Sequence, residues 1–199
     1  MLKFVVLFSI ILYSISCRAV VEKDDSSKQE CRKKFNGCLE QFMNKLRDVQ
    51  KVIDSSTTIT PLEFDIRKES KNMLKCIGIV ECKGPVKMTK FILDTTDFYT
   101  DRVWEANDCL EKTNSSHSLY NCINPKDFDF EVNKNFSQSV VPCTKEVIEK
   151  TECSIDIKVN LERGAYAVKD MYAQLEIASN DEEYKNNFDL VFDPRKYGF

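Results

Sequence analysis

Cysteine is the residue type in this chain whose number and spacing could do the most chemistry. The 199-residue sequence holds nine cysteines, and one of them, Cys17, lies in an N-terminal segment that we expect to be removed. The remaining set is even, which in an exported chain is typical of disulfide bonding throughout. Its members are Cys31, Cys38, Cys76, Cys82, Cys109, Cys122, Cys143 and Cys153.

Zinc binding and redox catalysis are the other uses of so many thiols. Structural zinc sites combine cysteines and histidines at short spacings, whereas this sequence has no Cys-x-x-Cys pair and a single histidine, His117. Redox-active cysteines favour the same Cys-x-x-Cys arrangement. We therefore predict disulfide bonds, with no metal site and no cofactor.

Catalytic motifs do not stand out elsewhere in the chain. His117 lies in a polar turn with no nucleophile or carboxylate placed beside it by sequence, as a catalytic histidine would require. Nucleophile elbows, phosphate-binding glycine loops and His-Glu-x-x-His helices do not occur in the sequence. We predict a protein that is not an enzyme and has no catalytic residues.

The first residues have the pattern of an export signal. Lys3 precedes an apolar run over residues 4–15, and Cys17-Arg18-Ala19 supplies small residues at the cleavage positions. A membrane-spanning helix needs about 20 apolar residues, so this run is too short. We predict a signal peptide over residues 1–19, a mature chain from Val20 and secretion without a membrane span. A bacterial lipoprotein cysteine at Cys17 is the disfavoured alternative.

Charge and length restrict the class of protein further. Acidic residues outnumber basic ones by 32 to 29, and the isoelectric point is near 5.4, which argues against a nucleic-acid partner. The mature length suits one domain with a real core. We predict a cysteine-rich domain over residues 20–178 and a polar tail over residues 179–199 that packs back in part.

Two helices folded back on each other are the elements that we expect to align the first cysteines. An apolar stripe with helical spacing runs from Phe35 to Ile53, and a second begins at Leu62. The midpoint between Cys38 and Cys76 falls in the polar stretch 55–58, as does the midpoint between Cys31 and Cys82. An antiparallel hairpin that turns there predicts both pairs as disulfides.

One feature of this hairpin needs an explanation. Cys76 and Cys82 are six residues apart, which places them about 120° out of phase on an ideal helix. Either Cys82 lies on an unwound last turn, which we expect to end at residues 83–85, or Cys31 pairs elsewhere. The remaining four cysteines would then pair among themselves.

The rest of the chain is expected to be helical, so the predicted fold class is an all-α, disulfide-stapled bundle. Residues 155–161 alternate apolar and polar side chains, which is normally typical of a strand, and we leave helix and strand both open there. Residues 126–141 carry aromatics without a period and predict a packed loop. The expected helices cover residues 85–94, 99–112, 118–123, 143–153 and 164–178.

Candidate modification and partner sites follow from this layout. Asn114 and Asn135 each begin an N-glycosylation sequon, and the turn around Asn114 favours its use. Trp104 and the phenylalanines Phe35, Phe42 and Phe91 are expected in the core. The aromatic residues 128–136 are where we would look for a partner surface.

Several motifs together resemble a known family. They are a Cys-x6-Cys helix after an export signal, Met73-Leu74-Lys75-Cys76-Ile77 ending in Glu81-Cys82, and Trp104-x4-Cys109-Leu110-x-Lys112. This pattern resembles the secreted cysteine-rich domains expanded in nematodes and known as domain of unknown function number nineteen. The resemblance implies a secreted, disulfide-rich protein and brings no catalytic residues with it.

These observations predict a secreted extracellular interaction module that acts on an unknown extracellular protein. An alternative is a carrier of a small apolar ligand or lipid, which would need an internal, mainly apolar cavity of about 300 Å³ or more. A third reading is a hydrolase that uses carboxylates, which would need a cleft with converging acids. A packed core with an exposed aromatic patch would favour the interaction module.

Overall fold

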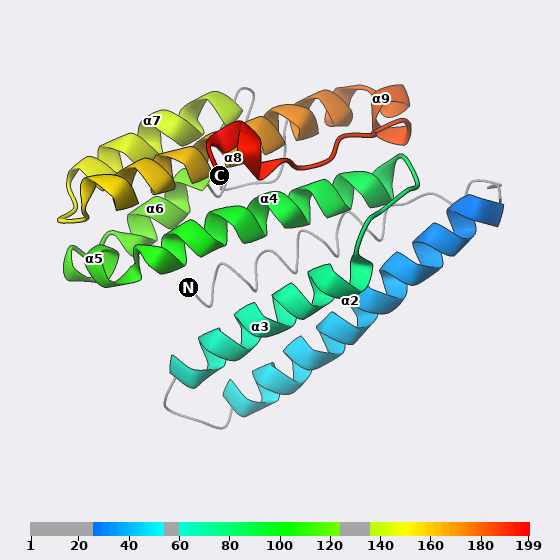
Figure 1. Ribbon diagram of the computed structural model, residues 1–199, viewed down its shortest axis with the longest axis horizontal. Coiled ribbons are helices and arrows are strands. Elements are labelled where there is room, and N and C mark those ends of the chain that lie inside the picture. Colours follow the sequence, from blue (N-terminus) through cyan, green and yellow to red (C-terminus); the bar gives the residue numbers. More distant parts are fainter. Residues whose placement is uncertain (1–25, 54–59, 124–135) are drawn as a thin grey trace. The chain divides into compact units, whose positions relative to one another are not determined.

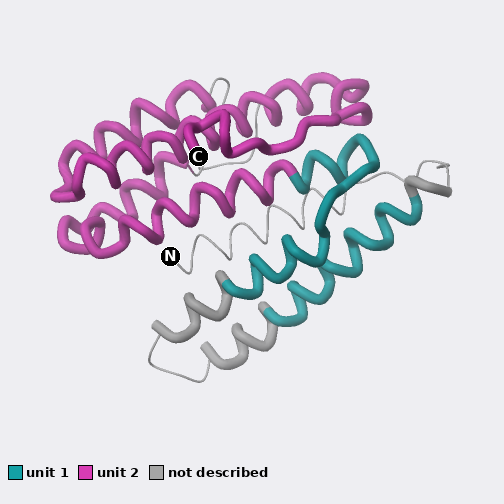
Figure 2. The backbone as a smooth tube through the Cα atoms, viewed as in Figure 1, with its two compact units in different colours: residues 1–90 teal, residues 91–199 magenta. Residues whose placement is uncertain are grey.

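The computed structural model describes residues 26–53, 60–123 and 136–199, and every regular element within them is a helix (Figure 1). The predicted all-α class is therefore confirmed. The signal peptide, the hairpin turn, the aromatic residues 128–135 and the sequon asparagine Asn135 lie outside the described residues. Figure 2 shows two compact units, residues 1–90 and residues 91–199, which are described separately below.

The first unit contains the predicted antiparallel hairpin. Helix α2 (Ser26–Ile53) and helix α3 (Thr60–Ile77) lie side by side. Disulfides join Cys31 to Cys82 and Cys38 to Cys76, with Cα–Cα distances of 6.1 and 5.8 Å. Both hairpin pairs are therefore present in the structure.

The end of α3 explains how Cys82 reaches Cys31. The helix stops at Ile77 because Gly78 adopts a left-handed φ of +61°, the conformation in which glycine commonly ends helices. The N–H of Gly78 donates to the carbonyl oxygen of Leu74 at 3.0 Å. Cys82 thus lies on a non-helical segment. The offset of about 120° from Cys76 that an ideal helix would impose does not apply there, so Cys82 can reach Cys31. The predicted stop at residues 83–85 was wrong by several residues.

Helix α4 (Pro85–Glu105) corrects the sequence analysis, which placed a short helix at 85–94 and another at 99–112. The polar residues 94–97 do not interrupt it. Thr95 is buried, and its Oγ1 donates to the carbonyl oxygen of Phe91 at 2.8 Å, so the hydroxyl is satisfied within the helix. Ala106 separates α4 from helix α5 (Asn107–Lys112).

Helix α6 (Ser116–Ile123) and helix α7 (Phe136–Glu149) follow in the second unit. The prediction was wrong at both ends of α7, which we expected at 143–153 after a loop. Pro142 lies inside the helix on its exposed side, although proline normally favours a helix start. The helix therefore contains the last residues of the predicted loop.

Helix α8 (Ile155–Asn180) resolves the ambiguous segment in favour of a helix. Ser154 caps it by accepting a hydrogen bond from the N–H of Ile157 at 3.4 Å. The helix that we expected at 164–178 therefore begins nine residues earlier. Helices α7 and α8 pack side by side.

The C-terminal segment packs onto α4 and α8 within the second unit. It contains helix α9 (Glu182–Asn186) and the short 3-10 helix η1 (Pro194–Tyr197). Phe188 is buried, with its ring centroid 5.6 Å from that of Phe91. Phe192 packs against Phe98 at 5.2 Å. Aromatic side chains therefore hold the polar tail to the helices.

Candidate interaction surface

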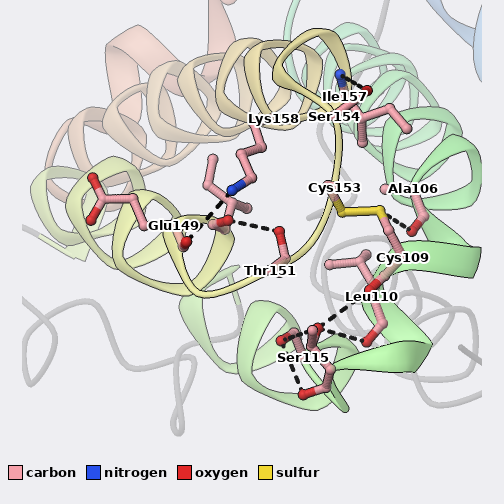
Figure 3. The surroundings of a disulfide bond; sticks show 12 residues. Ala106, Cys109, Leu110, Ser115, Glu149, Thr151, Cys153, Ser154, Ile157 and Lys158 are labelled. Atoms are coloured by element: carbon pink, nitrogen blue, oxygen red, sulfur yellow. Dashed lines mark hydrogen bonds between the residues drawn. A yellow bond between two sulfur atoms is a disulfide. The ribbon is translucent and has the colours of Figure 1, made fainter.

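The other four predicted cysteines pair among themselves in the second unit. Cys109 bonds Cys153 and Cys122 bonds Cys143. Figure 3 shows the first bond, which ties α5 to the residues just before α8. Next to it, Thr151 is buried and its Oγ1 donates to the carbonyl oxygen of Ile148 at 2.7 Å. The second bond joins α6 to the middle of α7, and the first joins α5 to the segment between α7 and α8.

Asn114 lies in the turn between α5 and α6. It is exposed and has a left-handed φ of +52°, a conformation that asparagine tolerates better than most residues. The next residue, Ser115, is buried and its hydroxyl lies 2.8 Å from that of Thr113. Asn114 is therefore an exposed residue in a turn that the neighbouring hydroxyls stabilise.

His117 is exposed in α6, with its ring stacked near that of Tyr120 at 6.5 Å between centroids. In the described part of the chain, no three His, Cys, Asp or Glu side chains gather in a way that could hold a metal ion. Within the same residues, every helix is too short or too polar to cross a bilayer.

A surface depression lies between the two helices of the hairpin. Its volume is about 320 Å³, and five of its nine lining residues are polar. They are Gln41, Asn44, Lys45, Glu69 and Asn72, and the Cys38–Cys76 disulfide lies beside them. Apolar atoms nevertheless make up most of its exposed lining, and the depression is open to solvent. It is this openness that differs from the enclosed cavity that a carrier would need.

An aromatic cluster of the second unit packs the C-terminal tail against α4. The guanidinium of Arg102 lies 3.7 Å from the ring centroid of Phe98 and 4.1 Å from that of Phe199, a favourable cation–π geometry. The Tyr197 hydroxyl donates to the carboxylate of Asp170 at 2.9 Å. Burial and this hydrogen bond raise the pKa of the Tyr197 phenol.

An exposed apolar stripe runs the length of α8. We call the α8 stripe the side chains of Ile155, Val159, Tyr166 and Ile177, which are 80%, 40%, 39% and 46% exposed. On an α-helix these positions fall within about 40° of one another, together with Ala173. Among the described residues these four side chains stay exposed on one face of the helix, unlike apolar side chains that are exposed singly.

The opposite face of α8 forms the core of the unit. Leu161, Val168 and Met171 are buried, and they lie about 140° to 160° away from the centre of the stripe. Helix α8 is thus apolar on two faces. Core packing accounts for one of them, and the other faces solvent.

Charged side chains border the stripe on both sides. On the side of α7, Glu162 pairs with Lys145 at 2.8 Å, and Glu176 accepts hydrogen bonds from the N–H and hydroxyl of Ser137. On the side of the tail, the Asp170 carboxylate binds Lys196 and Tyr197. These bonds hold the edges of the stripe in place.

Comparison of the chain with family models, curated proteins and solved structures found no match. The α8 stripe is therefore the feature on which a functional proposal rests.

Sequence reasoning missed this surface. The alternation of residues 155–161 suggested a strand, and the segment was set apart from the helix expected at 164–178. The spacing of Ile155, Tyr166 and Ile177 carried the signal, because intervals of 11 residues correspond to three full helical turns. The predicted partner surface at 128–136 lies mostly outside the described residues, and Phe136 itself packs edge-on against Tyr172 at 4.9 Å.

Proposed function

We propose that this chain is a secreted, disulfide-rich extracellular interaction module, without catalytic activity, whose contact surface is the α8 stripe. The observation that carries the proposal is an apolar stripe with a central tyrosine, exposed on the face of α8 opposite the core. Several apolar side chains exposed on one face and bordered by charges are typical of protein–protein contact sites.

The disulfides support the extracellular part of the proposal. Four disulfide bonds are consistent with folding in an oxidising compartment. The export pattern of residues 1–19 and the exposed sequon at Asn114 agree with it. We also propose that the chain is a member of the nematode-expanded family of secreted cysteine-rich domains.

The two alternatives receive less support from the described residues. The depression beside Cys38 and Cys76 has the volume of a small ligand, yet it is open to solvent rather than enclosed, so it does not favour a carrier. A carboxylate-based hydrolase would need acids free to act on a substrate. Asp170 and Glu176 instead bind donors of the chain itself.

Photo-crosslinking from the stripe tests the proposal. The mature chain would be secreted from a eukaryotic host with a photoreactive amino acid in place of Val159, and its N-terminus sequenced to check cleavage before Val20. We expect light-dependent adducts with a defined protein. Introducing Ile155→Glu into the same chain should abolish them, because a charge opposes apolar contact.

The matched control carries the photoreactive residue at Val191, which is also an exposed valine but lies in the tail. It should give no adduct of the same mass. Equal adducts from both positions, or none from Val159 at any concentration of the secreted material, would show that the stripe is not a contact surface.

A further inference from the structure

We infer that the α8 stripe binds a second copy of this chain, with the two α8 helices antiparallel about a two-fold axis at Tyr166. The inference rests on the proposed function and names the partner of the same surface. Three properties of the described residues carry it: the symmetry of the stripe, the charges along its edges and the exposure of the apolar side chains between them.

The stripe is symmetric about its central residue. Ile155 precedes Tyr166 by 11 positions and Ile177 follows it by 11. Val159 precedes it by seven, and Ala173 follows by seven. In an antiparallel pair centred on Tyr166, Ile155 therefore faces Ile177 of the second copy and Val159 faces its Ala173. An isologous contact requires this kind of self-complementary patch.

Charges on the α7 side of the stripe are complementary in this arrangement. Glu162 and Lys169 lie on the same edge of the helix, about 20° apart in helical phase. They are four residues before and three residues after Tyr166. The two-fold axis brings each edge against itself in reverse, so Glu162 of one copy lies within one residue, about 1.5 Å, of the level of Lys169 of the other, and the pair occurs twice.

The opposite edge repeats the relation. Arg163 and Asp170 share the edge next to the tail and lie three residues before and four residues after Tyr166. The axis therefore brings Arg163 within one residue, about 1.5 Å, of the level of Asp170 of the second copy. The two acids nearest the centre, Glu162 and Asp170, lie on different edges, so each faces a cation. Antiparallel alignment also opposes the two helix dipoles.

The size of the contact indicates a weak dimer. Helix α8 has 26 residues, hence a length of about 39 Å, and one helix pair buries less surface than a standard stable interface. We therefore expect an equilibrium between monomer and dimer that depends on concentration, with a dissociation constant of the order of micromolar to hundreds of micromolar.

Analytical ultracentrifugation of the secreted mature chain tests self-association over concentrations from about 1 to about 500 μM. Dimerisation should be seen for the wild-type chain. Val159→Glu should weaken it at least about a hundredfold, because the symmetric contact would bury the new charge twice. Val191→Glu is the matched control and should leave it unchanged. Circular dichroism should be the same for all three chains, since both valines are exposed.

A charge exchange tests the orientation. Glu162→Lys and Lys169→Glu should each weaken the homodimer about tenfold, since each variant places like charges opposite one another twice. An equimolar mixture of the two variants should recover a dimer of wild-type strength, because every facing pair is then of opposite sign. Glu162→Gln controls for the loss of the ion pair with Lys145 and should have a smaller effect than Glu162→Lys.

The remaining outcomes each overturn the inference. Parallel helices would place Glu162 opposite Arg163 and Lys169 opposite Asp170, so the mixture would show no recovery. A chain that stays monomeric at the highest concentration, or a dimer indifferent to Val159→Glu, would contradict self-association through the stripe. Adducts between the Val159 crosslinker and a different protein, from a monomeric chain, would leave the proposed function standing and refute this partner.

Discussion

Gly164 of α8 lies directly against the ring of Tyr99 of α4. A Cβ atom at position 164 would meet Cδ2 of that ring at 3.0 Å and Cβ of Arg102 at 3.8 Å. Tyr99 is 1% exposed, so its ring is enclosed and has little room to move. The absence of a side chain at Gly164 is therefore what lets α4 and α8 approach so closely.

Gly164→Ala should destabilise the protein despite the better helix propensity of alanine. The substitution favours the helix by about 1 kcal/mol, whereas overpacking a buried site costs about 1–3 kcal/mol. We expect a net loss of about 1 kcal/mol in the free energy of unfolding, measured by urea denaturation.

Gly37→Ala is the matched control, because Gly37 lies in α2 with nothing within 4 Å of its added Cβ. It should stabilise the protein by about 0.5–1 kcal/mol. A stabilising Gly164→Ala would contradict the close contact with Tyr99.

Tyr172 provides the second prediction, which concerns alkaline pH. Its hydroxyl donates to the carbonyl oxygen of Ile123 at 2.7 Å, and burial, helped by Tyr120, raises its pKa above the ordinary value of 10.0. Burial raises the pKa of Tyr99 in the same way. Because the folded state holds these phenols protonated, their contribution to stability is complete below pH 10 and is lost as the pH rises further.

The free energy of unfolding should therefore decline above about pH 10, while the part of the tyrosinate absorbance that belongs to Tyr99 and Tyr172 develops only as the protein unfolds. Tyr172→Phe should cost about 0.5–1.5 kcal/mol at neutral pH and make the alkaline decline shallower. Tyr166→Phe, at an exposed tyrosine of the same helix, should change neither quantity. A tyrosinate signal that develops fully in the native protein near pH 10 would contradict the prediction.

The third prediction concerns the hairpin disulfide between Cys38 and Cys76. This bond closes a loop of 38 residues, and in the chain-entropy model its removal frees about 4 kcal/mol of unfolded-state entropy, an upper value. The double substitution Cys38→Ala with Cys76→Ala should lower the melting temperature by about 10 °C.

Hydrogen exchange would localise this effect. Amides of α2 and α3 should lose protection, while those of α7 and α8, in the other unit, should keep theirs. Peptide mapping without reduction should still find the three other bonds. A peptide linking Cys38 to Cys109, Cys122, Cys143 or Cys153 in the wild-type chain would refute the pairing.

The fourth prediction concerns Asn114. Secretion from a eukaryotic host should attach a glycan there, and mass spectrometry of the peptide should show it disappear in Ser116→Ala, which removes the sequon without changing the asparagine. In protein without glycans, Asn114→Ala should cost about 1 kcal/mol because of the left-handed φ. Asn114→Gly should cost nothing comparable. An unmodified wild-type peptide would contradict the glycan, and equal stability of the Ala and Gly variants would contradict the strain.

The spacing of the cysteines and the periodicity of the apolar residues made the hairpin predictable from the sequence. The cysteines of α2 and α3 are placed symmetrically about one polar stretch, and each helix has an apolar stripe that only one helical phase can bury. An antiparallel turn is the simplest arrangement that satisfies both, which is why Cys38–Cys76 and Cys31–Cys82 could be predicted. The exact end of α3 was missed, because the left-handed turn at Gly78 competes with a downstream Gly84-Pro85 that looks like a better stop.

Hydrogen bonds within the helices, together with burial, decided the helices that the sequence left uncertain. The buried Thr95 suits a helix interior only when its hydroxyl has a partner. That partner is the carbonyl oxygen of Phe91, one turn earlier in the same helix. Residues 155–161 fit a strand equally well until their environment is known. The described residues contain no strand to pair with them, and Ser154 caps a helix instead.

The candidate site depended on tertiary structure most of all. A helix with apolar residues on two faces does not reveal from its sequence which face is buried. Burial is a property of the neighbours: Tyr99 of α4 lies against Gly164 on one side, α7 binds Glu162 and Glu176 along one edge, and the tail binds Asp170 along the other. The sequence by itself determined that α8 had apolar surface to bury. Only the packing around it decided that Leu161 would be enclosed and that Tyr166 would remain exposed.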